Sequence, residues 1–116
     1  MQTRVLLIED NEQNRYMAIF LLEKNGYEVL TAPDGPSGIA LATEIRPALI
    51  LLDIQLPGMD GYAVARALRE HPDLASTPIV AVTSFAMLGD KEKALAAGCD
   101  GYLEKPIDPD TFVAQI

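Results

Sequence analysis

The 116-residue chain has one cysteine, few basic residues and no hydrophobic run near the roughly 20 residues that cross a bilayer. The single cysteine, Cys99, excludes an internal disulfide and is typical of a reducing cytoplasm. The nine Lys and Arg residues are outnumbered by 17 Asp and Glu, and the net charge of −8 disfavours phosphate backbones and anionic membranes as partners. The first residues also lack the layout of a signal peptide. We therefore expect a cytoplasmic protein that contacts neither membrane nor nucleic acid directly.

What the sequence does contain is a set of short aliphatic runs that lead into polar residues. Residues 5–8 lead into Glu9 and Asp10, residues 49–52 into Asp53, residues 79–82 into Thr83, and residues 102–103 through Glu104 into Lys105. Short β-branched runs between helical stretches are typical of buried parallel strands. Because ligands bind outside the carboxyl ends of the strands in open α/β sheets, we expect these polar side chains to converge.

The pattern along the chain consists of five strand-then-helix units. Strands are predicted over residues 4–8, 28–32, 48–52, 78–82 and 101–103, and helices over residues 12–25, 36–46, a segment around Val64 and Leu68, residues 90–97, and a last segment beginning after Asp108. Five such units favour right-handed crossovers. The predicted fold is α/β, a doubly wound five-stranded parallel sheet in the flavodoxin-like order 2-1-3-4-5, in a single domain over residues 1–116.

Two details of the helices are also predicted. In the first helix, Met17, Phe20 and Leu21 are expected to form the buried stripe, together with the stem of Lys24, and Gly26 is placed to end the helix. The last helix is expected to use Asp108 as its N-cap and to carry a stripe formed by Phe112, Val113 and Ile116. The second strand has the weakest core signal and is expected at an edge of the sheet.

The carboxylates at the strand ends indicate a metal-dependent reaction at phosphorus. Two like charges about 4 Å apart repel by roughly 4 kcal/mol at an effective dielectric of about 20, so Glu9, Asp10 and Asp53 need a cation beside them. An all-oxygen ligand set suits Mg²⁺ or Mn²⁺ better than Zn²⁺. Asp53 is the candidate nucleophile, because a carboxylate can form an aspartyl phosphate. The Thr83 hydroxyl and the Lys105 ammonium can then hold phosphoryl oxygens.

Four segments in order carry the pattern of a known family: residues 5–11, with Glu9, Asp10 and Asn11; residues 52–61, with Asp53, Pro57 and Gly58; residues 82–84, with Thr83; and residues 98–106, with Lys105 and Pro106. Through them the chain resembles receiver domains of the two-component response-regulator family over essentially its whole length. It is most similar to stand-alone receivers of the DivK type and to receivers of hybrid histidine kinases.

The resemblance implies a phosphoacceptor rather than an enzyme acting on a free substrate. Asp53 would accept a phosphoryl group from the phosphohistidine of a histidine kinase or a histidine phosphotransfer protein, and self-phosphorylation and autodephosphorylation would be its only activities. The resemblance further implies that Asp10, Asp53 and the backbone carbonyl of Gln55 bind Mg²⁺, with Mn²⁺ as a possible substitute. Glu9 would act through water.

The resemblance also implies a switch. Thr83 and Lys105 would hold the phosphoryl oxygens, and Tyr102 would move with Thr83. A downstream protein target would read the change at a partner surface that includes Phe85, Met87 and Leu88.

Three other functions share parts of this pattern. A flavin carrier shares the fold, but Glu9 and Asp10 stand where an FMN phosphate would have to bind. A phosphatase of the haloacid-dehalogenase type would carry a second aspartate two positions after the nucleophile, where this chain has Gln55. The alternative that stays open is a phosphorylation-independent protein-binding module.

Overall fold

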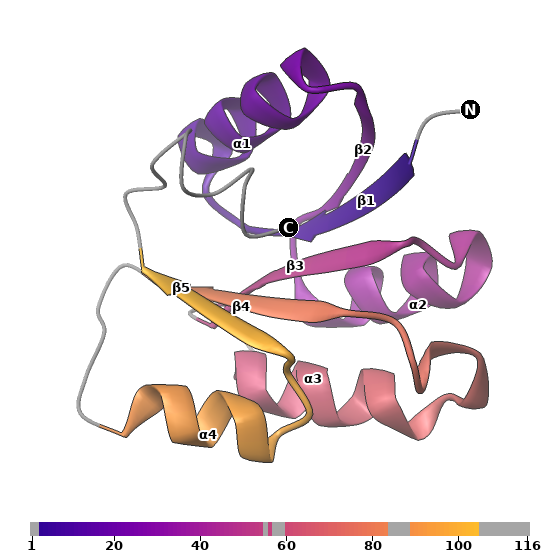
Figure 1. Cartoon of the computed structure of the whole chain (residues 1–116), viewed down its shortest axis with the longest axis vertical. Coiled ribbons are helices and arrows are strands. Elements are labelled where there is room, and N and C mark those ends of the chain that lie inside the picture. Colours follow the sequence, from indigo (N-terminus) through magenta and orange to yellow (C-terminus); the bar gives the residue numbers. More distant parts are fainter. Residues whose placement is uncertain (1–2, 55, 57–59, 84–88, 105–116) are drawn as a thin grey trace.

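Strands and helices alternate along the computed structural model, which describes residues 3–54, 56, 60–83 and 89–104 (Figure 1). The strands are β1 (Thr3–Ile8), β2 (Tyr27–Ala32), β3 (Leu49–Asp53), β4 (Ile79–Thr83) and β5 (Gly101–Glu104). The helices are α1 (Glu12–Lys24), α2 (Gly35–Ile45), α3 (Gly61–Glu70), the 3₁₀ turn η1 (Pro72–Leu74) and α4 (Asp90–Ala96). The predicted last helix, with Asp108 as its N-cap, lies outside the described residues.

The five strands form one parallel sheet in the order β2-β1-β3-β4-β5. The predicted fold class and strand order are therefore confirmed, and β2 lies at an edge as expected. The register aligns Ile8 with Leu52, Asp53 with Val82, and Thr83 with Glu104. The carboxyl ends of β1, β3, β4 and β5 therefore meet at the same edge of the sheet.

Helices cover both faces of this sheet, with α1 on one side and α2, α3 and α4 on the other (Figure 1). Alternate strand residues pack into two separate cores because side chains alternate across a strand. Leu6, Ile8, Ile50 and Leu52 face the three-helix side, whereas Val5, Leu7, Leu49 and Leu51 face α1. Every residue of β3 is buried, which explains why this central strand reads as a continuous aliphatic run in the sequence.

The predicted buried stripe of α1 is wrong. Met17 and Phe20 are 56% and 58% exposed, and Lys24 is also exposed, whereas Ala18 and Leu22 pack against the sheet and Leu21 is half-buried. Residues 16–22 are hydrophobic without interruption, so the sequence gives no phase for the buried face. Which face of α1 is buried is set instead by how the helix packs against the sheet after the connection from β1.

The helix ends follow the expected local chemistry. Asn11 and Asp34 are N-caps whose side chains accept hydrogen bonds from Asn14 N at 2.9 Å and Ser37 N at 2.8 Å. The bonds from Ser37 lower the pKa of the Asp34 carboxyl below its usual value. Gly26, with φ of +89°, follows α1 in the left-handed conformation that glycine adopts readily, as predicted.

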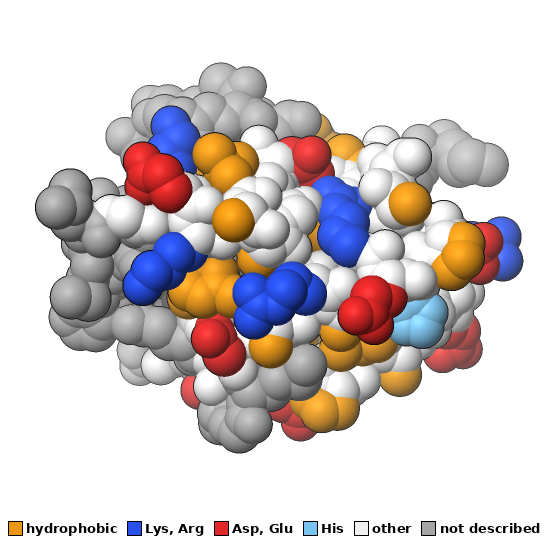
Figure 2. Space-filling model, turned by 90° about the horizontal axis from the view of Figure 1, so that it is seen from below, with side chains coloured by type: hydrophobic (Ala, Val, Ile, Leu, Met, Phe, Trp, Pro, Cys, Tyr) orange, Lys and Arg blue, Asp and Glu red, His pale blue; other side chains and the backbone are white. Residues whose placement is uncertain are grey.

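The outer surface is mixed in character where α3 and α4 form it. Figure 2 shows that basic, acidic and hydrophobic side chains alternate there, and on the described part of this face neither sign of charge forms a continuous patch. Among the described helices, none is both long and apolar enough to cross a bilayer.

Arg69 on α3 ties together the amino-terminal ends of β4 and β5. Its guanidinium donates to four backbone carbonyls and to the Asp100 carboxylate. The N···O distances to the carbonyls are 2.8 Å for Gly98, 2.8 Å for Leu74, 3.4 Å for Ala75 and 2.6 Å for Thr77. The distance to Asp100 Oδ2 is 2.7 Å. Asp100 in turn accepts from Ile79 N at 2.9 Å and donates its own N–H to Ile79 O at 2.7 Å. Gly98 is packed against the stem of Arg69, since a Cβ there would lie 2.7 Å from Arg69 Cγ. One side chain thus donates to carbonyls of the turns before β4 and β5, one of which, Leu74 O, also accepts from Thr77 N at 3.3 Å.

Replacing this arginine should be costly. We expect Arg69→Met to lower the free energy of unfolding by about 2–4 kcal/mol, because part-buried carbonyls and the Asp100 carboxylate lose a charged donor. Urea unfolding monitored by circular dichroism measures the loss. Arg66→Met is the matched control, because Arg66 is an exposed arginine on the same helix, and it should change stability by less than about 0.5 kcal/mol. Equal effects of the two substitutions would contradict the role given to Arg69.

Cys99, next to this cluster, gives a prediction about alkaline pH. Burial raises the pKa of its thiol from 9.0 to about 11, with Arg69 opposing the rise. The unfolded chain therefore loses this proton at a lower pH than the folded chain, and stability falls as pH rises from about 9 toward 11. In urea unfolding at pH 8 and pH 10, the wild type should lose up to about 1 kcal/mol more than Cys99→Ala. Parallel losses in the two proteins would contradict the buried neutral thiol.

Candidate functional site

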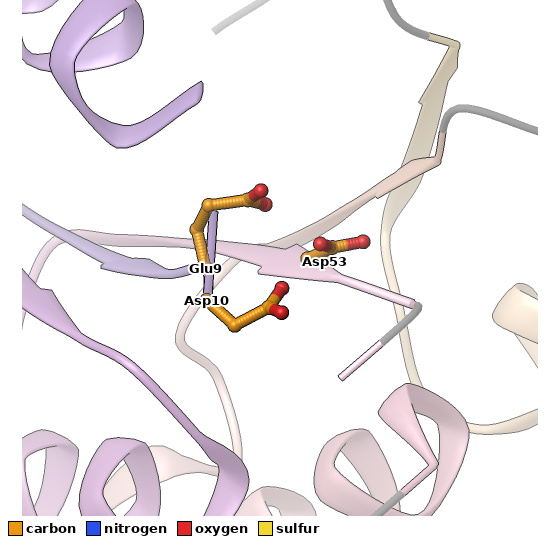
Figure 3. A group of neighbouring side chains, drawn as sticks. All are labelled: Glu9, Asp10 and Asp53. Atoms are coloured by element: carbon orange, nitrogen blue, oxygen red, sulfur yellow. The ribbon is translucent and has the colours of Figure 1, made fainter. Parts of the chain in front are cut away.

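Three carboxylates meet at the carboxyl edge of the sheet (Figure 3). Glu9 and Asp10 directly follow β1, Asp53 is the last residue of β3, and these two strands are paired. One oxygen from each of the three residues lies within 4.8 Å of the others. Glu9 and Asp53 are only 2% and 4% exposed, whereas Asp10 is exposed and borders solvent. The predicted convergence of these three side chains is present in the structure.

This arrangement favours a bound divalent cation. Like charges this close repel by several kcal/mol, and the burial of Glu9 and Asp53 adds a desolvation cost. The donor atoms are all carboxylate oxygens, the set that Mg²⁺ and Mn²⁺ prefer. The exposed Asp10 leaves a route from solvent. The residues therefore fit a magnesium-type ion rather than zinc.

The next two predicted site residues lie on the neighbouring strands. Thr83 is the last residue of β4, is 2% exposed, and stands one position beyond Val82, the register partner of Asp53. Tyr102 on β5 is aligned with Ala81 of β4 and packs, half-buried, against the core on the three-helix side. Thr83, on the strand next to β3, therefore borders the carboxylates, whereas Tyr102 lies one strand further away, on β5.

The remaining predicted site residues lie outside the described residues: Gln55, Lys105, Phe85, Met87 and Leu88. In the sequence, Lys105 follows Glu104, which ends β5 opposite Thr83 in the register.

Asp53 is supported from behind by the start of α3. Gly61 N donates to Ile54 O at 3.0 Å. A Cβ at Gly61 would lie 2.5 Å from Ile54 Cα and 2.8 Å from Asp53 O, which only glycine allows. The close approach of α3 thus fixes the backbone at and just after the Asp53 carboxylate.

Two polar residues of α1 belong to the site and were not predicted from the sequence. The Asn14 side-chain amide donates to Glu9 Oε1 at 3.0 Å. Arg15 Nη1 donates to the backbone carbonyls of Glu9 at 2.9 Å and Asp10 at 3.0 Å. Their position in the sequence is the signal that could have identified them. They lie in the first turns of the helix that begins after the Asn11 N-cap, and side chains in these turns can reach the end of the strand that precedes the helix.

Comparison with known families and proteins gives a consistent result. The family model described as the response regulator receiver domain matches residues 5–116. Among curated proteins, the polar-differentiation response regulator DivK of Brucella anthropi is 41% identical over 116 residues, which cover 100% of this chain and 94% of that protein. The DivK protein of Brucella ovis is 40% identical over the same shares.

Solved structures agree with this. The chemotaxis protein CheY4 of Vibrio cholerae has a TM-score of 0.94 at 32% identity, covering 99% of this chain and 96% of that one. The receiver domain of the sensor histidine kinase PA1611 from Pseudomonas aeruginosa has a TM-score of 0.92 at 34% identity, covering 99% and 94%. In that protein, a magnesium ion is coordinated in the active-site cleft.

The carboxylate cluster predicts opposite effects of one substitution with and without metal. In wild type, MgCl₂ at about ten times its dissociation constant should raise the thermal unfolding midpoint by roughly 5 °C relative to EDTA. Asp10→Asn should raise the midpoint in EDTA, because repulsion is relieved, and should abolish most of the Mg²⁺ response.

Glu44→Gln, which removes an exposed charge on α2, is the control and should keep the wild-type response. A full Mg²⁺ response in Asp10→Asn would exclude Asp10 from the metal site.

Proposed function

The chain belongs to the response regulator receiver domain family, and on this premise we propose that Asp53 is the residue that accepts the phosphoryl group. Members of the family act in two-component systems, where they take phosphoryl groups from histidine kinases and act on downstream targets. The observation that carries the proposal is the position of Asp53 at the end of the buried central strand, between the Glu9–Asp10 pair and Thr83.

The proposed reaction is the transfer of a phosphoryl group from the phosphohistidine of a partner. An Asp53 carboxylate oxygen attacks phosphorus, and the phosphorus–nitrogen bond to the histidine breaks. The imidazole nitrogen keeps the electron pair of that bond and takes up a proton, which leaves a neutral histidine and an acyl phosphate on Asp53. The burial of Asp53 limits the access of water, and so favours transfer over loss to hydrolysis.

The metal site follows from the same residues. We propose that Asp10, Asp53 and the backbone carbonyl of Gln55 hold Mg²⁺, with Mn²⁺ as a substitute, and that Glu9 contributes through water. The ion supplies neutralisation of the negative charge on the phosphoryl oxygens. The support for this assignment is the all-oxygen donor set within 4.8 Å.

Two further residues are proposed to hold the phosphoryl oxygens: Thr83 through its hydroxyl and Lys105 through its ammonium group. Thr83 is supported by its position at the end of the strand next to Asp53. Lys105 is supported by the family pattern and by its place directly after β5 in the sequence. Together they give the transferred group a hydroxyl donor and a cation.

Phosphorylation would act as an electrostatic switch. It adds a charge of about −1.5 to −2 and three acceptor oxygens, which draw Thr83 toward Asp53 and bias the position of Tyr102. Tyr102 lines a groove of about 400 Å³ between α4 and β5, with Lys91, Leu95 and Leu103 among its other lining residues. A protein that docks there would sense the state of Tyr102, and we propose that Phe85, Met87 and Leu88 belong to the same surface.

The domain so defined spans residues 1–116 and works in the cytoplasm. Its phosphodonor is a histidine kinase or a histidine phosphotransfer protein, and its target is another protein rather than nucleic acid or membrane. Its own catalytic activities are self-phosphorylation from small phosphodonors and autodephosphorylation.

The test is phosphorylation by acetyl phosphate, followed by intact mass. With MgCl₂, wild type should gain the mass of one phosphoryl group, and Asp53→Asn should gain none because its amide is not a nucleophile. Wild type in EDTA should be phosphorylated at least about tenfold more slowly, since the charge on the phosphoryl oxygens is no longer neutralised. Asp73→Asn is the matched control. Asp73 is an exposed aspartate in η1, outside the proposed site, so this variant should behave as wild type.

The outcomes separate the alternatives. A phosphoryl group on Asp53→Asn would mean that another residue is the nucleophile. No gain in wild type, with folding verified by thermal unfolding, would favour a phosphorylation-independent protein-binding module.

A further inference from the structure

The acidic site is held from the helix side by Asn14 and Arg15, two half-buried residues near the start of α1. We propose that they are positioning residues that set the affinity of the site for its divalent cation. Neither residue is expected to touch the ion, and both act through Glu9 and Asp10. The inference rests on the proposed metal-dependent function of this site, and it states that residues of α1 help to set the affinity of the site for the ion.

Arg15 acts on the backbone. Glu9 N still donates to Ala32 O at 3.0 Å, as a continuation of the sheet, but beyond this bond the chain leaves the ladder. The carbonyls of Glu9 and Asp10 are then bound by one guanidinium nitrogen, Arg15 Nη1, at 2.9 and 3.0 Å. Charge-assisted bonds of this kind are short and strong. They fix the orientation of two successive peptide groups, and with it the directions in which the Glu9 and Asp10 side chains leave the backbone.

Asn14 acts on a side chain. Its backbone N–H is bound by the Asn11 side chain at 2.9 Å, so its position at the start of the helix is set. Its amide then donates to Glu9 Oε1 at 3.0 Å. This bond restricts the rotation of a carboxylate that is almost fully buried. Asn14 therefore keeps Glu9 turned toward Asp10 and Asp53, as Figure 3 shows it, without adding any charge to the site.

Positioning and simple electrostatics predict opposite results for Arg15. A cation beside the site repels an incoming divalent ion, so on electrostatic grounds alone, removing the charge should tighten Mg²⁺ binding. If Arg15 instead keeps the Glu9 and Asp10 backbone in the orientation that binds the ion, replacing Arg15 lowers the fraction of molecules with that orientation. The apparent affinity falls in proportion. The direction of the change in affinity therefore decides between the two roles.

The experiment measures the Mg²⁺ dissociation constant of the full chain from the thermal unfolding midpoint as a function of MgCl₂ concentration, with no phosphodonor present. We expect Arg15→Gln to bind Mg²⁺ about tenfold more weakly than wild type, and Asn14→Ala to bind it several-fold more weakly, as substitutions behind a metal ligand do. Arg15→Lys, which keeps the charge and one hydrogen-bonding group, should recover part of the loss. Arg66→Gln, an equal change of charge on the exposed face of α3, should leave the constant within about twofold.

Each result supports or overturns the proposal. Weaker binding in Arg15→Gln and Asn14→Ala, with partial rescue in Arg15→Lys, supports it. Wild-type or tighter binding in Arg15→Gln overturns it, whatever the change in the metal-free midpoint. Absence of Mg²⁺ binding in wild type overturns the metal site together with the positioning roles. Binding that follows the expected order in a chain that acetyl phosphate does not modify would instead overturn only the phosphoacceptor role of Asp53.

Discussion

The parallel pairing of β1 with β3 is the constraint on which the rest of this structure depends. It brings the carboxylates of Glu9 and Asp10 beside Asp53, although three negative charges at this spacing repel one another. Burial of aliphatic side chains on both faces of the sheet holds the strands together against that repulsion. The fold therefore stores a local electrostatic cost at the place where a cation and a phosphoryl group would bind, and binding of the cation relieves it.

The parts of this arrangement that the sequence predicted are those set by strand composition. Aliphatic runs that end in polar residues identify parallel strands and their carboxyl ends, so the convergence of Glu9, Asp10 and Asp53 followed directly. The strand order followed from the weak core signal of β2, which placed it at an edge and matched the flavodoxin-like order. The buried face of α1 did not follow, because residues 16–22 are all hydrophobic and give no phase. Asn14 and Arg15 were missed for a related reason. Their hydrogen bonds to Glu9 depend on the rotation of α1 about its own axis, which the sequence does not specify.

The two ends of the sheet are built differently. At the carboxyl edge lie charged and hydroxyl side chains on separate strands, held by a few bonds from α1 and by the close approach of Gly61. At the opposite edge, Arg69 and Asp100 join α3 and the starts of β4 and β5 in one network. The displacements proposed for Thr83 and Tyr102 would thus take place in strands whose amino-terminal ends are held by this network.

Cys99 has a practical consequence for work on this protein. It is the only cysteine in the sequence, it is buried between Gly98 and Asp100, both bound by Arg69, and burial raises the pKa of its thiol to about 11. Thiol-reactive probes need an accessible thiolate. A second cysteine introduced at an exposed position, such as one on the outer face of α1, can therefore take a spin label or fluorophore while Cys99 stays unmodified. The natural sequence thus serves directly as the background for distance measurements between labelled partners.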